Sequence, residues 1–219
     1  FGELCIEAIS EELKIPFRPA RNRFEEISSK DSLTSLSKAL SAYASSLWKI
    51  ASDIRYLASG PRCGIAEIRI PALQPGSSIM PGKVNPVIPE SVLQVCARVI
   101  GNDTTVTLAN ASGHLELNVM MPLMGKVIVE SLNLLSRASS LFAERCVRGI
   151  EADEKRCREL VERSLALVTP LAEKIGYDRA AEVAHEAYRT GKSLREVIRE
   201  RGILPDEELD SVLDPEKMV

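Results

Sequence analysis

The chain has 219 residues, which is enough for one or two globular domains. Its hydrophobic content of 45% and charged content of 27% are ordinary for a globular protein, and its net charge of −3 argues against a partner that is a nucleic acid or an anionic membrane surface. Aromatic residues make up only 4% of the chain, so aliphatic side chains must fill the core, which suits helix-on-helix packing.

The cysteines number five and none lies in a Cys-x-x-Cys pair. We therefore expect neither a disulfide framework nor a zinc site, and we predict no metal ligand. Reduced thiols fit a cytoplasmic location. We also find no signal peptide and no apolar run of the length that a membrane span needs, so no membrane partner is expected.

The first predicted elements are a helix from Gly2 to Leu13 and, after a polar stretch, one long helix that stops at Gly60-Pro61. Apolar residues recur along the long helix at alternating spacings of three and four, which indicates a heptad seam. The seam residues are Leu33, Leu36, Leu40, Tyr43, Leu47, Ile50, Ile54 and Leu57. Such a helix cannot bury its apolar face alone, so we expect partner helices in this chain or in other subunits.

Further along, the pattern predicts two more long helices. The first begins with Asn85 as N-cap and Pro86 in its first turn, and runs to about residue 109. The second spans about residues 119–147, and Pro122 is a candidate site for a kink. The first half of this last helix is apolar on nearly all sides, which only a helix surrounded by other helices tolerates.

After Gly149 the sequence becomes highly charged, and glycines separate shorter segments. The helices expected there span about residues 154–164, 178–190, 194–201 and 206–212. Asp178 is predicted to cap the helix that it begins. The predicted fold class is therefore all-α, with a long-helix bundle segment over residues 1–149 and a small helical domain over residues 150–219.

The most informative segment precedes the second long helix and reads Gly76-Ser77-Ser78-Ile79-Met80-Pro81-Gly82-Lys83-Val84-Asn85-Pro86. It places two hydroxyls, one cation and one amide in a loop whose glycines and prolines set its backbone angles. Stretches rich in Gly and Pro usually only join helices, but the order of these residues is far more specific than the glycines alone. The helix that follows points its N-terminus at the loop, where backbone N–H groups favour an anion.

This loop, residues 75–86 with its flanking prolines, resembles the signature of the fumarase/aspartase superfamily. Members of that superfamily add or remove a small group across a carbon–carbon double bond of a dicarboxylate. The resemblance implies a small dicarboxylate substrate, no cofactor, and a homotetramer whose sites combine three subunits. It also implies the long-helix bundle of that superfamily.

Elimination from malate or aspartate removes a weakly acidic proton from the carbon beside a carboxylate. The site needs a base, positive charge or donors at that carboxylate, and an acid for the leaving group. By resemblance, Ser77 is the catalytic base and Glu90 is the partner of a catalytic histidine. The residues that match the family's substrate contacts are Ser78, Lys83, Val84 and Asn85.

Each of these residues also has a structural interpretation. The two serines can bond the loop to itself, Lys83 can be a solvated lysine, and Glu90 suits any helix N-terminus. The family's Thr-His segment is absent, and the histidines present are His114, expected to be structural, and His185, expected at the surface. Roughly the first half of a family member is missing, so we expect a fragment, a processed chain or one piece of a split protein, inactive alone.

The substrate is the remaining question. Asn22–Glu25, Ser112–His114 and Ile175–Ala181 resemble fumarase, whereas Pro71–Pro75 and Val87–Glu90 look more like aspartase. The prediction is fumarate hydratase, which reversibly hydrates fumarate to L-malate, with aspartate ammonia-lyase as the alternative. A catalytically inactive fragment or structural superfamily member is the alternative from another class.

Overall fold

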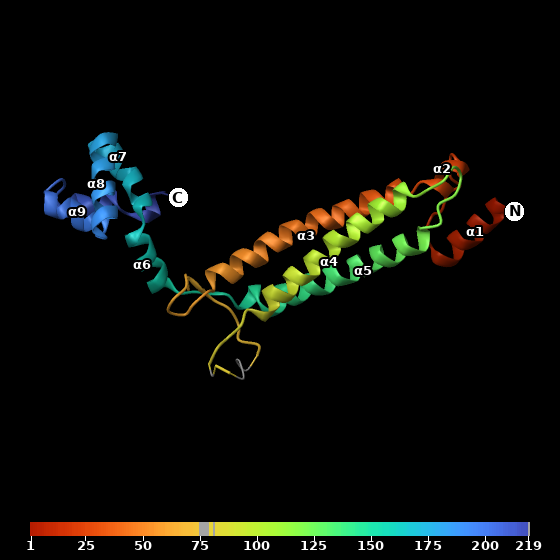
Figure 1. Ribbon diagram of the computed structural model, residues 1–219, viewed down its shortest axis with the longest axis horizontal. Helices are drawn as coiled ribbons and strands as arrows, with labels where there is room; N and C mark the ends of the chain where they lie inside the picture. Colours follow the sequence, from red (N-terminus) through yellow and green to blue (C-terminus); the bar gives the residue numbers. More distant parts are fainter. Residues whose placement is uncertain (75–78, 81, 219) are drawn as a thin grey trace. The chain divides into compact units, whose positions relative to one another are not determined.

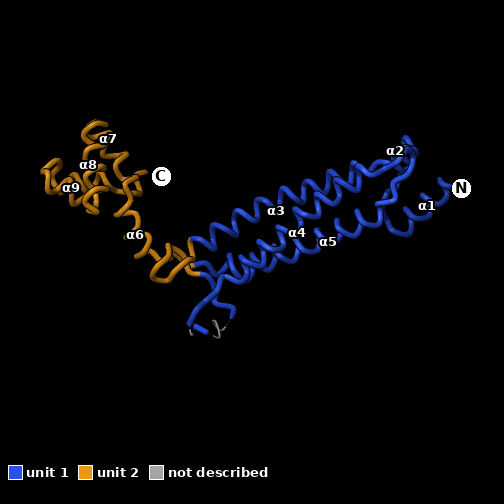
Figure 2. Tube along the Cα trace, viewed as in Figure 1, with its two compact units in different colours: residues 1–56, 70–150 blue, residues 57–69, 151–219 orange. Residues whose placement is uncertain are grey.

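The computed structural model describes residues 1–74, 79–80 and 82–218. The predicted all-α fold class is confirmed, since the strands among the described residues are limited to one two-residue pair. The chain divides into two compact units, Phe1–Tyr56 with Ile70–Ile150 and Leu57–Arg69 with Glu151–Val219 (Figure 2). The domain boundary at residues 149 and 150 stays a prediction. The compact units differ from it in that the segment after the first long helix packs with the C-terminal residues.

In the first unit the long helices α3, α4 and α5 lie side by side (Figure 1). Its helices are α1 (Gly2–Leu13), α2 (Arg23–Ser28), α3 (Asp31–Leu57), α4 (Val87–Ala111) and α5 (Met121–Arg145), followed by the 3₁₀ turn η1 (Val147–Gly149). The predicted helix at the start of the chain and the three long helices are confirmed. The short helix α2 was not predicted. Asn22 caps it, because its side chain accepts hydrogen bonds from the backbone N–H groups of Phe24 and Glu25.

The closest packing in this unit is between α4 and α5. Its centre is a cluster of buried apolar side chains, and the partly buried Leu33 and Met120 pack against it. The cluster members are Val106, Ala109, Met124, Val127 and Ile128. Burying an aliphatic side chain of this size contributes about 1.5–3 kcal/mol, so the α4–α5 contact is the main source of stability in the bundle.

The heptad seam predicted for α3 is only partly buried within this unit. Leu47 and Ile54 are buried, whereas Leu36, Tyr43 and Ile50 are 41%, 48% and 48% exposed. The buried stripe of α3 instead consists of Ser37, Ala44, Leu47, Ala51 and Ile54. The helix therefore carries two neighbouring apolar stripes. One packs within the unit, and the other stays on its surface.

Polar contacts fix how α3 lies along α4. Ser37 Oγ donates to Asp103 Oδ1 at 2.9 Å, and near the start of α3 the Asn110 amide donates to Asp31 Oδ1 at 2.8 Å. The hydrogen bond from Asn110, with a second from Ser29, lowers the pKa of Asp31. Because early residues of α3 meet late residues of α4, the two helices run antiparallel.

Three local predictions about helix ends were wrong. Pro86, not Asn85, is the N-cap of α4, and Pro122 lies in the first turn of α5, where a proline causes no kink. Asp178 lies in the first turn of its helix, and the N-cap is Gly176. At α4 and α8 the N-cap lies one or two residues before or after the residue that the sequence favoured.

The C-terminal unit has an apolar core of its own. Its helices are α6 (Glu154–Arg163), α7 (Val168–Ile175), α8 (Tyr177–Thr190), α9 (Leu194–Arg201) and α10 (Asp206–Val212). The core includes Leu171, Val183, Val197, Ile198 and Leu209, each fully or almost fully buried. The sequence patterns predicted four of these helices and missed α7.

The segment after α3 is tied to α6 within this unit. Strand β1 (Ile68–Arg69) pairs antiparallel with β2 (Glu151–Ala152). Beside the pair, Asp153 N donates to Glu67 O at 2.8 Å and Arg156 Nε donates to Ile65 O at 3.0 Å. Among the described residues, no helix is long and apolar enough to span a membrane.

Asn118 joins the end of α4 to the start of α5. It is completely buried, its amide donates to Ala109 O at 3.0 Å, and its Oδ1 accepts from Met120 N at 2.8 Å. One side chain thus satisfies backbone groups that both helix ends leave free.

Replacing Asn118 with Ala should destabilise the first unit, because the buried Ala109 carbonyl loses one of its donors and the partly buried Met120 N–H loses its acceptor. We expect a loss of about 1–3 kcal/mol in the free energy of unfolding, measured by urea denaturation. Glu116→Ala, an exposed position in the same turn, is the control and should change stability little. Equal stability of the two variants would contradict the role of Asn118.

Candidate functional site

The candidate site lies where the signature loop enters α4. Ser77 and Ser78, the predicted base and a predicted substrate contact, lie outside the described residues. Lys83 N donates to Met80 O at 3.2 Å, which closes a turn. Gly82 lies within this turn at φ +81°, an angle that favours glycine.

The predicted substrate-binding residues come directly before the helix. Lys83 and Val84 are exposed, and Asn85 is partly buried. Asn85 O accepts from Val87 N at 2.9 Å, and no side-chain hydrogen bond caps the N-terminus of α4 within the described residues. The first N–H groups of α4 thus supply partial positive charge a few residues after Lys83, and an anion such as a carboxylate suits this place.

Glu90 occupies the first turn of α4, so the structure brings it close to the Lys83–Asn85 segment. Its side chain is 39% exposed, and its Oε1 lies 3.5 Å from Nε of Arg55 in the last turn of α3. We did not single out Arg55 from the sequence. The available signal was a basic residue at the end of the long helix, shortly before the signature loop.

The histidine that shares a unit with Glu90 lies far from it. His114 is exposed beyond the far end of α4, with its Nδ1 3.2 Å from Ser112 O and its backbone paired with Leu117. At 1.5 Å per residue, α4 separates it from Glu90 by roughly 30 Å. His185 is exposed on α8, as predicted. The unit that contains Glu90 therefore offers no histidine close enough to pair with it.

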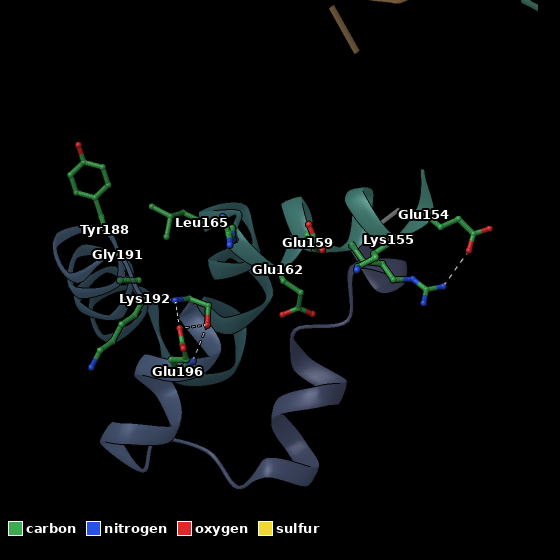
Figure 3. Close-up of a pocket in the computed structure, with 13 residues that line it drawn as sticks. Glu154, Lys155, Glu159, Glu162, Leu165, Tyr188, Gly191, Lys192 and Glu196 are labelled. Carbon is green, nitrogen blue, oxygen red and sulfur yellow. Dashed lines mark hydrogen bonds and ion pairs between the residues drawn. The ribbon is translucent and has the colours of Figure 1, made fainter. Parts of the chain in front are cut away.

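A surface hollow of about 1280 Å³ lies in the C-terminal unit between α6, α8 and α9 (Figure 3). It contains none of the predicted site residues, and several charges around it have partners. Lys192 Nζ donates to Glu200 at 2.6 Å, and this contact raises the pKa of Lys192. Ser193 donates to Glu196 from its backbone and its hydroxyl, which lowers the pKa of Glu196. We therefore place the candidate site at the start of α4.

Metal binding receives no support from the described part of the chain. No group of three or more His, Cys, Asp and Glu side chains is arranged there to hold a metal ion. The chemistry available at the start of α4 is instead that of a cation, an amide, a carboxylate and helix N–H groups. These groups are suited to binding a carboxylate and moving a proton.

Comparisons with known proteins agree with this reading of the loop. The family model described as Lyase matches residues 1–101, and the one described as Fumarase C C-terminus matches residues 167–219. Fumarate hydratase 2 of Arabidopsis thaliana is 47% identical over 212 residues, covering 97% of this chain and 42% of the relative. The chain belongs to the fumarase/aspartase superfamily.

Other superfamily members show the same correspondence. Fumarate hydratase class II of Methylorubrum extorquens is 47% identical over 219 residues, covering 100% of this chain and 46% of the relative. The crystal structure of a fumarate lyase:delta crystallin from Brucella melitensis superposes with a TM-score of 0.91 at 49% identity, covering 99% of this chain and 47% of that one. A class II fumarase from Schistosoma mansoni gives 0.86 at 39% identity, with 93% and 43% covered. The chain spans about half the length of the curated relatives it matches.

The cysteines differ in environment within this superfamily chain. Cys63 is exposed, whereas Cys96 and Cys146 are buried, and burial raises the pKa of both buried thiols. The thiolate is the reactive form of cysteine. A raised pKa and poor access to reagents therefore both reduce the reactivity of the two buried thiols.

A maleimide reagent at neutral pH should therefore label Cys63 first and reach Cys96 and Cys146 only when the chain unfolds. Mass spectrometry of partially labelled protein would identify the sites. Cys63→Ser should abolish the fast phase. Early labelling of Cys96 in folded protein would show that the α4 stripe is not buried as described.

Proposed function

We propose that this chain is the C-terminal half of a class II fumarate hydratase, which interconverts fumarate and L-malate. The observation that carries the proposal is the match to relatives named fumarate hydratase over nearly the whole chain, at 46% to 48% identity. That match spans the stretch of the chain that contains the signature loop, Lys83 and Asn85. The N-terminus of α4 supplies the electrostatic setting that a dicarboxylate requires.

In this proposal each residue has one task. Ser77 removes the proton from the carbon beside a carboxylate of malate, and Lys83 with Asn85 stabilises the charge that develops on that carboxylate. Ser78 and Val84 contact the substrate. Glu90 orients a histidine from elsewhere in the protein. The reaction needs no cofactor for these steps.

The proposal extends to assembly and location. The exposed stripe of α3 and a hollow of about 760 Å³ between α3 and α4, which exposes Trp48 and Ile100, suit packing against other copies of the chain. A homotetramer would cover such surfaces. We propose a cytoplasmic location, although relatives named mitochondrial occur among the fumarate hydratases.

Aspartate ammonia-lyase remains the second candidate. The segments Pro71–Pro75 and Val87–Glu90 favour it, because they resemble aspartase more than fumarase. A structural, non-catalytic superfamily member is the third. The retained Ser77, Lys83 and Asn85 argue against that last candidate.

The full-length protein that contains this chain should hydrate fumarate and dehydrate malate, followed by the ultraviolet absorbance of the double bond. The 219-residue chain alone should be inactive, because the family's Thr-His segment is absent from it. Aspartate is the control substrate and should release no ammonia. If the protein releases ammonia from aspartate and forms no malate from fumarate, the function is that of aspartase. Turnover by the isolated chain would refute the proposal that its site needs residues outside this chain.

In the full-length enzyme, Ser77→Ala should lower kcat far more than it changes KM, because a base acts only on the way to the transition state. Lys83→Ala should impair both constants and reduce kcat by about 10²–10³-fold, as loss of a preorganised charge does. Lys83→Arg should rescue only partly, since a planar guanidinium does not replace an ammonium.

Lys155→Ala, an exposed position on α6, is the matched control and should leave both constants unchanged. Normal kcat with a raised KM in Ser77→Ala would make Ser77 a binding residue and remove its assignment as the base.

A further inference from the structure

An ion pair connects the last turn of α3 to the first turn of α4. Arg55 Nε lies 3.5 Å from Glu90 Oε1, and the two side chains are 52% and 39% exposed. Glu90 N also donates to Pro86 O at 3.1 Å, so the backbone that carries the carboxylate belongs to the helical ladder of α4. The pair therefore joins two rigid helices at the place where the signature loop ends.

This ion pair is not needed to hold α3 against α4. Ser37–Asp103 and Asn110–Asp31 already connect the two helices by hydrogen bonds of 2.9 Å and 2.8 Å. Ion pairs as exposed as Arg55–Glu90 contribute little to stability, since water screens them and both side chains lose freedom. The main consequence of the contact is for the carboxylate itself, whose rotation it restricts.

The nearest atoms of this ion pair are Arg55 Nε and Glu90 Oε1. No hydrogen bond to Glu90 Oε2 occurs among the described residues. A carboxylate that is held on one side presents its second oxygen in a defined direction. Such outer partners orient the group that does the chemistry, and this matters more than their own binding energy.

We propose that Arg55 is a positioning residue of the active site, which holds the Glu90 carboxylate so that Oε2 accepts a hydrogen bond from the catalytic histidine. The inference rests on the proposed function, because it needs Glu90 to act on a histidine. It adds a residue from α3, about thirty positions before the signature helix begins, to the machinery of the site. Arg55 acts through Glu90 and does not itself contact the substrate.

The test uses the full-length enzyme with Arg55→Met and Arg55→Lys. Arg55→Met should lower kcat about tenfold with little change in KM, because loss of an outer partner typically costs about 10–100-fold. Arg55→Lys keeps the charge without the planar fork and should fall between Arg55→Met and wild type. Wild-type kcat in both variants would overturn the proposal.

The matched control is Arg98→Met. Arg98 pairs with Glu130 at 3.1 Å between α4 and α5, with exposures of 59% and 33%, so it is a comparable ion pair between helices. It lies eight residues after Glu90, about 12 Å along the helix. Arg98→Met should keep the wild-type kcat. Equal losses of kcat in the two methionine variants would assign the Arg55 effect to general helix packing and overturn the proposal.

A double-mutant cycle separates positioning from structure. In a Glu90→Gln background, Arg55→Met should lower kcat less than about twofold, because the group through which it acts is already disabled. An additive loss would overturn the proposal.

If the wild-type enzyme turns over aspartate instead of fumarate, only the proposed function is refuted, and the same cycle would then be measured with aspartate. Turnover of neither substrate would overturn both.

Discussion

The packing of α4 against α5 is the interaction on which the first unit depends. Its buried cluster centres on Val106, Met124 and Val127, and Asn118 closes the turn that joins the two helices. Because α4 is held along its length by apolar contacts, its N-terminus has a fixed direction. The signature loop ends on that N-terminus, so the bundle core determines where the cation, the amide and the helix N–H groups lie.

Polar contacts then set the position of α3 on this pair of helices. Apolar surfaces alone permit sliding, since dispersion and burial have no directional preference. Hydrogen bonds from Ser37 to Asp103 and from Asn110 to Asp31 remove that freedom. The same alignment brings Arg55 to Glu90. The contact at the candidate site therefore depends on the register of α3 against α4, which hydrogen bonds farther along the two helices determine.

The C-terminal unit follows a different principle. Its core is made of short helices that could not be stable singly, and charged residues cover their outer faces. Arg195 shows this well, because it contacts Glu162 of α6 and Asp210 of α10 from its place on α9. Residues 57–69, which follow α3, belong to this unit through the β1–β2 pair and Arg156. The chain that leads into the loop is therefore held by backbone hydrogen bonds before it reaches the loop.

The sequence by itself determined the helical class, the three long helices, most of the C-terminal helices and the identity of the loop residues. Periodicity and glycine or proline stops carry that information locally. Tertiary structure decided which of two stripes on α3 is buried within the unit, because the buried stripe is rich in small residues such as Ala44 and Ala51 and the more apolar one remains exposed. It also decided the N-caps of α4 and α8, where packing outweighed the capping preferences of Asn85 and Asp178. The Arg55–Glu90 pair could not be predicted, since two residues 35 positions apart meet only when the antiparallel register of α3 and α4 is known.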